Sequence, residues 1–148
     1  MDAYRIHDRR FHALSGSGAA RHGGRWNPRG LPLVYASPSY EGSLLETLAR
    51  AEIGVFPVDH VASRILLPED SEVPVLSDVE YSDWRDAVRS RAIGEAWAAS
   101  VSSLALLVPS YVAQPWGWNV VLNPRHPDFF QVRVAETVEI LWDSRLHR

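Results

Sequence analysis

The sequence predicts an α+β fold with a central mixed or antiparallel sheet and flanking helices. Short apolar segments rich in β-branched and aromatic residues recur along the chain and predict strands. Two longer segments have helical spacing instead. No repeat, linker or charge block divides the 148 residues, so we expect one domain spanning 1–148.

The N-terminal half predicts several strands around one helix. Strands are expected at 3–7, 31–37, 62–68 and 73–77, and a loop of small residues follows the first. The helix is expected to begin with Ser37 as its N-cap and Pro38 in its first position, and to end at Gly54. Its predicted apolar stripe consists of Leu44, Leu45, Leu48 and Ala49.

The C-terminal half predicts a second helix and then strands. The helix is expected over 82–100, with Gly94 as a break or a close contact. Its predicted inward residues are Trp84, Val88, Ile93, Ala96 and Trp97. Strands separated by turn residues are expected at 104–110, 119–123, 129–134 and 138–142.

Composition excludes several classes of site. The chain has no cysteine, so disulfides, thiolate catalysis and cysteine zinc sites are unavailable. The six histidines show no metal-ligand spacing, and we expect no metal. No phosphate-binding P-loop, nucleophile elbow or dinucleotide fingerprint is present. A net charge of -3 disfavours broad nucleic-acid binding, and the absence of a signal peptide or membrane-spanning run predicts a cytoplasmic protein.

Two arginines lie on either side of the small-residue loop and are candidate anion ligands. Arg5 precedes the loop, and Arg25 follows Gly23 and Gly24. Glycines allow backbone N–H groups to approach an anion, and a guanidinium binds phosphate in bidentate fashion. The alternative is structural: each arginine forms a salt bridge and Trp26 packs into the core.

Tyr35 and Glu46 are the next candidates. Tyr35 ends a strand, where its ring can stack on a planar ligand while its hydroxyl stays hydrogen-bonded. Glu46 lies at the edge of the helix's apolar stripe, with Gly42, Ala49 and Ile53 as its same-side neighbours. A carboxylate there can stabilise a developing cation or orient a hydroxyl. The alternatives are an ordinary half-buried tyrosine and a solvated or salt-bridged carboxylate.

Neutral hydrogen-bonding side chains lie at strand ends in the last third. Ser110 follows an apolar strand, and Asn119 and Asn123 flank another. All three are candidate partners of a polar ligand, although turn and cap roles are common for such residues. Trp116 and Trp118 are a candidate partner patch, with buried packing or a loop position as the alternative.

The order of these motifs resembles the RES domain, the toxin half of bacterial RES–Xre toxin–antitoxin pairs. The resemblance covers nearly the whole chain and is carried by YRIH, LSGSGAARHGGRWNPRG, LVYAS, LLETL, LLVPS and NVVLNPRHPDF. Members of this family resemble ADP-ribosyltransferase toxins in fold and consume NAD. The resemblance implies ligand binding by Arg5 and Arg25, Tyr35 beside the nicotinamide, and Glu46 as the catalytic carboxylate. Ser110 and Asn123 are further expected ligand-binding residues.

The leading hypothesis is therefore an NAD-consuming toxin with an Xre-type antitoxin as its partner. The resemblance leaves the ADP-ribose acceptor open between phosphate, water and a protein such as a phosphoribosyl-pyrophosphate synthetase. A second hypothesis is a non-catalytic nucleotide-binding or protein-interaction module. An RNA-cleaving toxin is disfavoured by the charge balance and by the absence of a His/Lys cluster.

Overall fold

The computed structural model describes residues 1–52 and 55–146. Its strands are β1 (Asp2–Asp8), β2 (Val34–Ala36), β3 (His60–Leu66), β4 (Ala105–Pro109), β5 (Trp118–Leu122) and β6 (Arg133–Glu139). Its helices are α1 (Ser17–His22), α2 (Tyr40–Arg50) and α3 (Ala87–Ser100), with short 3-10 helices η1 (Phe129–Gln131) and η2 (Ser144–Leu146). None of the described helices is long and apolar enough to cross a membrane.

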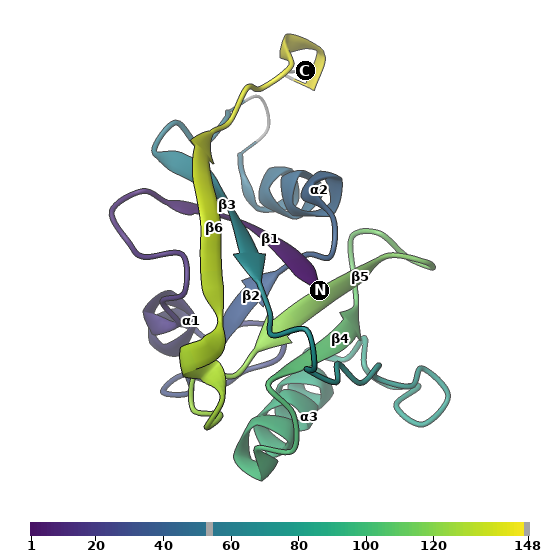
Figure 1. The fold of residues 1–148 in the computed structure, drawn as a ribbon. Coiled ribbons are helices and arrows are strands. Elements are labelled where there is room, and N and C mark those ends of the chain that lie inside the picture. Colours follow the sequence, from purple (N-terminus) through teal and green to yellow (C-terminus); the bar gives the residue numbers. More distant parts are fainter. Residues whose placement is uncertain (53–54, 147–148) are drawn as a thin grey trace.

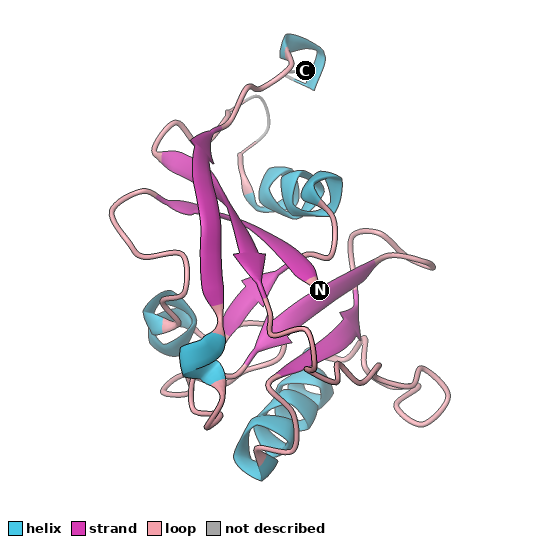
Figure 2. Ribbon diagram, in the orientation of Figure 1, coloured by secondary structure: helices cyan, strands magenta, loops and turns pink. Residues whose placement is uncertain are grey.

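The strands form two three-stranded antiparallel sheets rather than one central sheet (Figures 1 and 2). The first sheet has the order β1-β3-β6 and the second the order β2-β5-β4. An isolated antiparallel bridge between Tyr4 and Ser37 joins β1 to the chain just after β2. The predicted α+β class is confirmed, and the sheet arrangement is antiparallel.

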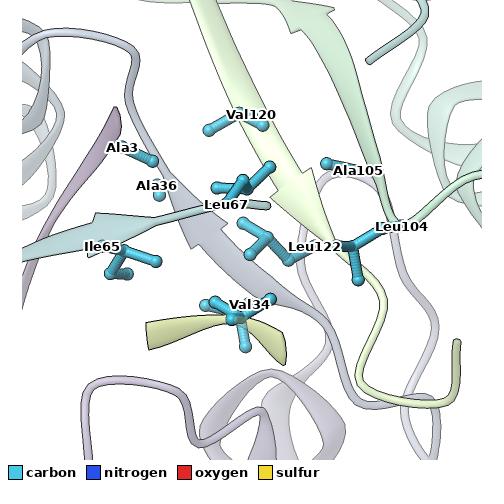
Figure 3. Packing of buried hydrophobic residues seen from close by; sticks show 10 residues of the cluster. Ala3, Val34, Ala36, Ile65, Leu67, Leu104, Ala105, Val120 and Leu122 are labelled. Atoms are coloured by element: carbon cyan, nitrogen blue, oxygen red, sulfur yellow. The ribbon is translucent and has the colours of Figure 1, made fainter. Parts of the chain in front are cut away.

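The second sheet is buried on both faces because its apolar residues alternate between two cores. Val120 and Leu122 of β5 pack toward the first sheet, in a cluster with Ala3, Ile65 and Val34 (Figure 3). Val121, between them, belongs to a second cluster that contains Ile93 and Ala98 of α3. Successive strand side chains point to opposite faces. The second sheet therefore lies between the first sheet and α3.

The two long helices begin where side chains cap them. Ser39 accepts a hydrogen bond from the backbone N–H of Gly42 at the start of α2, and Asp86 accepts one from Arg89 at the start of α3. The expected starts at Ser37 and residue 82 are therefore wrong, because the nearer polar residues supply the caps. The expected end at Gly54 lies outside the described residues.

Several other local predictions were also wrong. Val88 and Ala96 point outward, because the buried side of α3 runs through Ser90, Ile93, Gly94 and Ala98.

Three predictions outside the helices also differ from the structure. Residues 73–77 form no strand, only one bridge from Val75 to Leu107. The expected strands at 129–134 and 138–142 are replaced by η1 and one continuous strand, β6. The small-residue loop contains α1.

Gly94 makes a close contact rather than a break. A Cβ atom at this position would lie 1.8 Å from the carbonyl oxygen of Trp26. Ser90, one turn earlier on α3, donates a hydrogen bond of 2.7 Å to the carbonyl of Arg25. The helix thus packs directly against the chain at residues 25–26, which only a glycine at position 94 permits.

Candidate active site

The site lies toward one end of the second sheet, on the side that faces α3. Tyr35 pairs with Val121 and Val108 pairs with Asn119, so these four residues share that face. Ser110 follows β4 at the same end of the sheet. Glu46 reaches it from α2, which begins four residues after β2 ends.

Glu46 is held by two neutral donors. Ser110 Oγ donates to Glu46 Oε1 over 2.8 Å, and Asn119 Nδ2 donates to the same oxygen over 2.7 Å. No hydrogen bond to Glu46 Oε2 comes from the described residues. Neutral donors orient a carboxylate without cancelling its charge. The half-buried carboxylate therefore presents one charged oxygen in a fixed direction.

Asn123 lies at the far end of β5 from Asn119. Its side chain is fully buried, donates to the carbonyl of Ala98 over 2.9 Å and accepts from the backbone N–H of Arg125 over 3.0 Å. Asn123 is four positions after Asn119, and at the usual rise of an extended strand their Cα atoms are about 13 Å apart. The structure therefore brings Ser110 and Asn119 to Glu46, and Asn123 to the end of α3.

Tyr35 supports the glycine-flanked corner at residues 22–30. Its hydroxyl donates to Asn27 Oδ1 over 2.6 Å and accepts the backbone N–H of Trp26 over 3.0 Å. Burial raises the pKa of Tyr35 to about 12, while the charges of Arg50 and Arg25 act to lower it. The hydroxyl is engaged within the protein, as expected, and stays protonated at neutral pH.

The corner itself is held together by the side chain of Asn27. Asn27 Nδ2 donates to the carbonyls of Ala19, Pro28 and Leu31 at 2.8 to 3.0 Å. A Cβ on Gly24 would lie 2.8 Å from both Asn27 Oδ1 and Tyr35 Oη, so the chain there passes too close for a larger residue. Trp26 is 2% exposed and belongs to the core, which confirms its packing role. The corner is a rigid base for Arg25.

Two arginines, Arg25 and Arg50, lie close enough to Tyr35 to act on its pKa, and the buried Arg5 lies near Arg50. Arg5 donates to the carbonyls of Ala13 and Ser15, and Arg25 has one long bond of 3.5 Å to the carbonyl of Arg85. Burial and the charge of Arg50 lower the pKa of Arg5 to about 10, so it remains charged at neutral pH. The ion pairs of the described residues include none of Arg5, Arg25 and Arg50. This concentration of positive charge is suited to an anion.

Sequence reasoning did not select Arg50 or Tyr111. Arg50 is four residues after Glu46, so the two lie on the same side of α2. Tyr111 follows Ser110, and its ring lies 4.1 Å from the guanidinium carbon of Arg25. Helical spacing from Glu46 was a usable signal for Arg50, whereas only the folded chain brings Tyr111 to Arg25.

A small hollow lies beside Ser110, one of the two donors to Glu46. Its volume is about 70 Å³, and its walls include Trp84, Arg85, Ser110, Pro115 and Trp118. Pockets that enclose a small ligand measure roughly 300–1,000 Å³. The hollow therefore has room for only a fragment of a ligand. No cluster of potential metal ligands was found in residues 1–52 and 55–146.

Comparison with known proteins places this arrangement in context. The family profile of the RES domain matches residues 2–143. The "Prs ADP-ribosylating toxin" of Sphingobium sp. is 34% identical over 141 residues, covering 91% of this chain and 87% of the relative. "Toxin Res" of Yersinia enterocolitica is 36% identical over 141 residues, covering 87% of this chain and 88% of the relative.

The fold also matches a solved structure. A chain in the crystal structure of the M. tuberculosis MbcT–MbcA toxin–antitoxin complex superposes with a TM-score of 0.74. The match covers 94% of this chain and 83% of the other, at 24% sequence identity. At this identity the likeness concerns the fold.

Proposed function

Because the chain belongs to the RES domain family, we propose that it is the toxin of a toxin–antitoxin pair and that it cleaves NAD. Relatives that share about a third of its residues over most of their length are named toxins, and one is named ADP-ribosylating. The observation that carries the proposal is the Glu46 carboxylate, oriented by two neutral donors on the sheet that also presents Tyr35 beside Arg25.

The reaction needs a fixed negative charge. When the bond between nicotinamide and ribose breaks, its electron pair leaves with the nicotinamide and the ribose carbon acquires oxocarbenium character. Glu46 stabilises that charge and accepts a hydrogen bond from a ribose hydroxyl through Oε2. Nicotinamide leaves as a neutral molecule because it is cationic in NAD. The site therefore needs no strong general acid.

The arginines bind the rest of the substrate. The pyrophosphate of NAD is the anion that Arg25 and Arg50 hold, since guanidinium groups without acidic partners retain their donors for phosphate oxygens. Arg5 adds its positive charge and the donors that its bonds to the carbonyls of Ala13 and Ser15 leave. The ring of Tyr35 lies against the nicotinamide end and its hydroxyl holds the corner that carries Arg25. Ser110 acts through Glu46. Ligand binding by Asn123, which the resemblance implies, would require its buried side chain to leave its partners Ala98 and Arg125.

The acceptor of ADP-ribose completes the reaction. A nucleophilic oxygen or nitrogen attacks the ribose carbon, forms a bond to it and loses its proton. The acceptor is a protein side chain, phosphate or water. The name of the Sphingobium relative favours a protein acceptor, whereas a site presented on a compact domain also admits phosphate or water. We place this activity in the cytoplasm, under the control of an antitoxin of the Xre type.

Incubation of the purified protein with NAD tests the proposal. The mixtures contain buffer alone, phosphate, or a cell lysate with labelled NAD. Nicotinamide release is followed by chromatography and labelled protein by electrophoresis. The products ADP-ribose, ADP-ribose phosphate and labelled protein identify water, phosphate and protein as acceptors. Absence of nicotinamide in all three mixtures would refute NAD cleavage.

A Glu46→Gln variant tests the role of the carboxylate. Loss of a charge that stabilises the transition state lowers kcat by about 100-fold to 1,000-fold. Glu41→Gln is the matched control, because Glu41 is exposed in the first turn of the same helix. NAD binding without nicotinamide release by the wild type would instead support a non-catalytic nucleotide-binding module.

A further inference from the structure

The guanidinium of Arg25 lies over the ring of Tyr111. The Arg25 guanidinium carbon lies 4.1 Å from the centre of the Tyr111 ring, over its face. The hydrogen bond from Arg25 to the carbonyl of Arg85 is long, at 3.5 Å. A cation over an aromatic face is attracted by the ring's electron density. The ring therefore holds this guanidinium more directly than any carboxylate among the described residues.

The Tyr111 ring is itself supported by the core. It meets the Trp84 ring edge to face, with centres 6.1 Å apart and an angle of 85°. Trp84 is 1% exposed and stacks on Trp26 with centres 6.2 Å apart. Trp26 follows Arg25 in the chain. The contacts therefore link Arg25 to Tyr111, Tyr111 to Trp84 and Trp84 to Trp26, which is the next residue after Arg25 in the chain.

The backbone around Tyr111 is also held. Ser110 N–H donates to the carbonyl of Gly117 over 2.9 Å, and Gly117 N–H donates to the carbonyl of Ala113 over 2.8 Å. The backbone N–H of Ala113 donates to Ser110 Oγ over 3.1 Å. A Cβ at Gly117 would lie 2.3 Å from the Ala113 Cβ, so the loop is closely packed. These bonds determine where the Tyr111 side chain starts.

Two consecutive residues thus contact two oppositely charged groups of the site. Ser110 donates to Glu46, and Tyr111 lies against Arg25. Their Cα atoms are about 3.8 Å apart, as across any trans peptide. We propose that Tyr111 is a positioning residue, which holds the Arg25 guanidinium by its face so that Arg25 binds the ADP-ribose part of NAD. This inference rests on the proposed NAD-cleaving function.

The geometry explains why an aromatic ring suits this task. An aromatic ring attracts the charge of a guanidinium but offers no carboxylate oxygen to its five N–H donors. A carboxylate partner would take two donors and cancel the charge. With Tyr111 as its support, Arg25 keeps its donors and its charge for the anionic oxygens of the ligand.

A double-mutant cycle on ligand affinity tests the role of Tyr111. Titration calorimetry with ADP-ribose measures Kd for the wild type, Tyr111→Leu, Arg25→Ala and the double variant. Tyr111→Leu is expected to raise Kd about fivefold, the size of a partly exposed cation–π contact. In the Arg25→Ala background the same change is expected to raise Kd less than about twofold. Tyr111→Phe retains the ring and is expected to restore most of the affinity.

Trp116→Leu is the matched control, because it removes an aromatic side chain that is 87% exposed from the same loop. Equal effects of Tyr111→Leu with and without Arg25 would overturn the proposal, since a purely structural loss does not depend on that guanidinium. No effect in either background, or no binding of ADP-ribose by the wild type, would also overturn it. ADP-ribose binding with the expected coupling but no nicotinamide release from NAD would refute the proposed function and leave the role of Tyr111 standing.

Discussion

The two sheets of this protein place their polar side chains differently. The first sheet carries ion pairs on its surface, where Arg64 of β3 contacts Asp2 and Glu136 on the strands on either side. The second sheet is buried on both faces, and polar side chains of the site lie toward one end of it. At that end Asn119 holds Glu46.

This difference bears on how the site is oriented. Exposed ion pairs exchange readily with water and salt, so they orient their side chains weakly. Buried polar groups must be hydrogen-bonded, because an unpaired group costs about 1–3 kcal/mol. The polar atoms of Tyr35, Asn27 and Asn123 all have partners within the protein. The second sheet therefore provides the better base for a site that needs fixed geometry.

The largest effect is expected where α3 packs on the corner beside the second sheet. Gly94→Ala would bring a Cβ to 1.8 Å from the Trp26 carbonyl oxygen. Because neither atom can move away without a shift of packed backbone, we expect the free energy of unfolding to fall by about 3 kcal/mol. Urea denaturation measures it. Gly18→Ala is the control, since a Cβ at Gly18 meets nothing within 4 Å. Equal stability of the two variants would contradict the close packing.

The next comparison separates the two ends of β5. Asn119→Ala removes a hydrogen bond to a charged oxygen, so kcat for nicotinamide release is expected to fall about 10-fold to 100-fold. Asn123→Ala leaves the carbonyl of Ala98 without its donor and is expected to lower the free energy of unfolding by about 1–3 kcal/mol.

Kinetics and urea denaturation of both variants check this division. A large fall in kcat/KM for Asn123→Ala at unchanged stability would show that Asn123 binds ligand, as the resemblance to the family implies. An unchanged kcat for Asn119→Ala would mean that Ser110 alone is enough to orient Glu46.

Tyr35→Phe tests the hydrogen bonds beneath the corner. Loss of the bonds to Asn27 and the Trp26 N–H is expected to cost about 1–3 kcal/mol of stability at neutral pH. Tyr35 has a pKa of about 12 in the folded protein against 10.0 ordinarily, so its contribution is complete below pH 10.0 and is lost as pH rises toward 12.

Urea midpoints of wild type and Tyr35→Phe between neutral pH and pH 11 measure this dependence, with pH values about one unit apart. The gap between the two proteins is expected to narrow above pH 10.0, since only the wild type carries the Tyr35 hydroxyl. A constant gap over this range would contradict the raised pKa. Other tyrosines titrate in both proteins and cancel in the comparison.

The smallest effect is expected on the first sheet. Arg64→Gln removes the contacts of 3.2 Å to Asp2 and 3.3 Å to Glu136, all on exposed side chains. We expect a change in the urea midpoint close to the experimental error, and none in concentrated salt. A loss of stability as large as that of Gly94→Ala would show that the surface ion pairs of the first sheet contribute as much as the buried contacts beside the second.

Much of the site was predictable because its chemistry is local. Arg25 between glycines and a proline turn, Tyr35 at a strand end and Glu46 on a helix were all selected from neighbouring residues. Ser110 and Asn119 were recognised as neutral donors, but their shared partner was not, because 64 and 73 residues separate them from Glu46. Contacts over such distances depend on strand pairing.

The amino-acid sequence by itself determined the α+β class, most strand positions and the residue types that carry the chemistry, since alternation and helical spacing are properties of short segments. Only the tertiary structure decided that the strands form two sheets, that Gly94 meets Trp26 and that Asn119 rather than Asn123 reaches Glu46. It also decided that Tyr111 supports Arg25. These outcomes depend on which distant surfaces pack together. The packing is determined by the apolar residues on both faces of the second sheet, which must be buried at the same time.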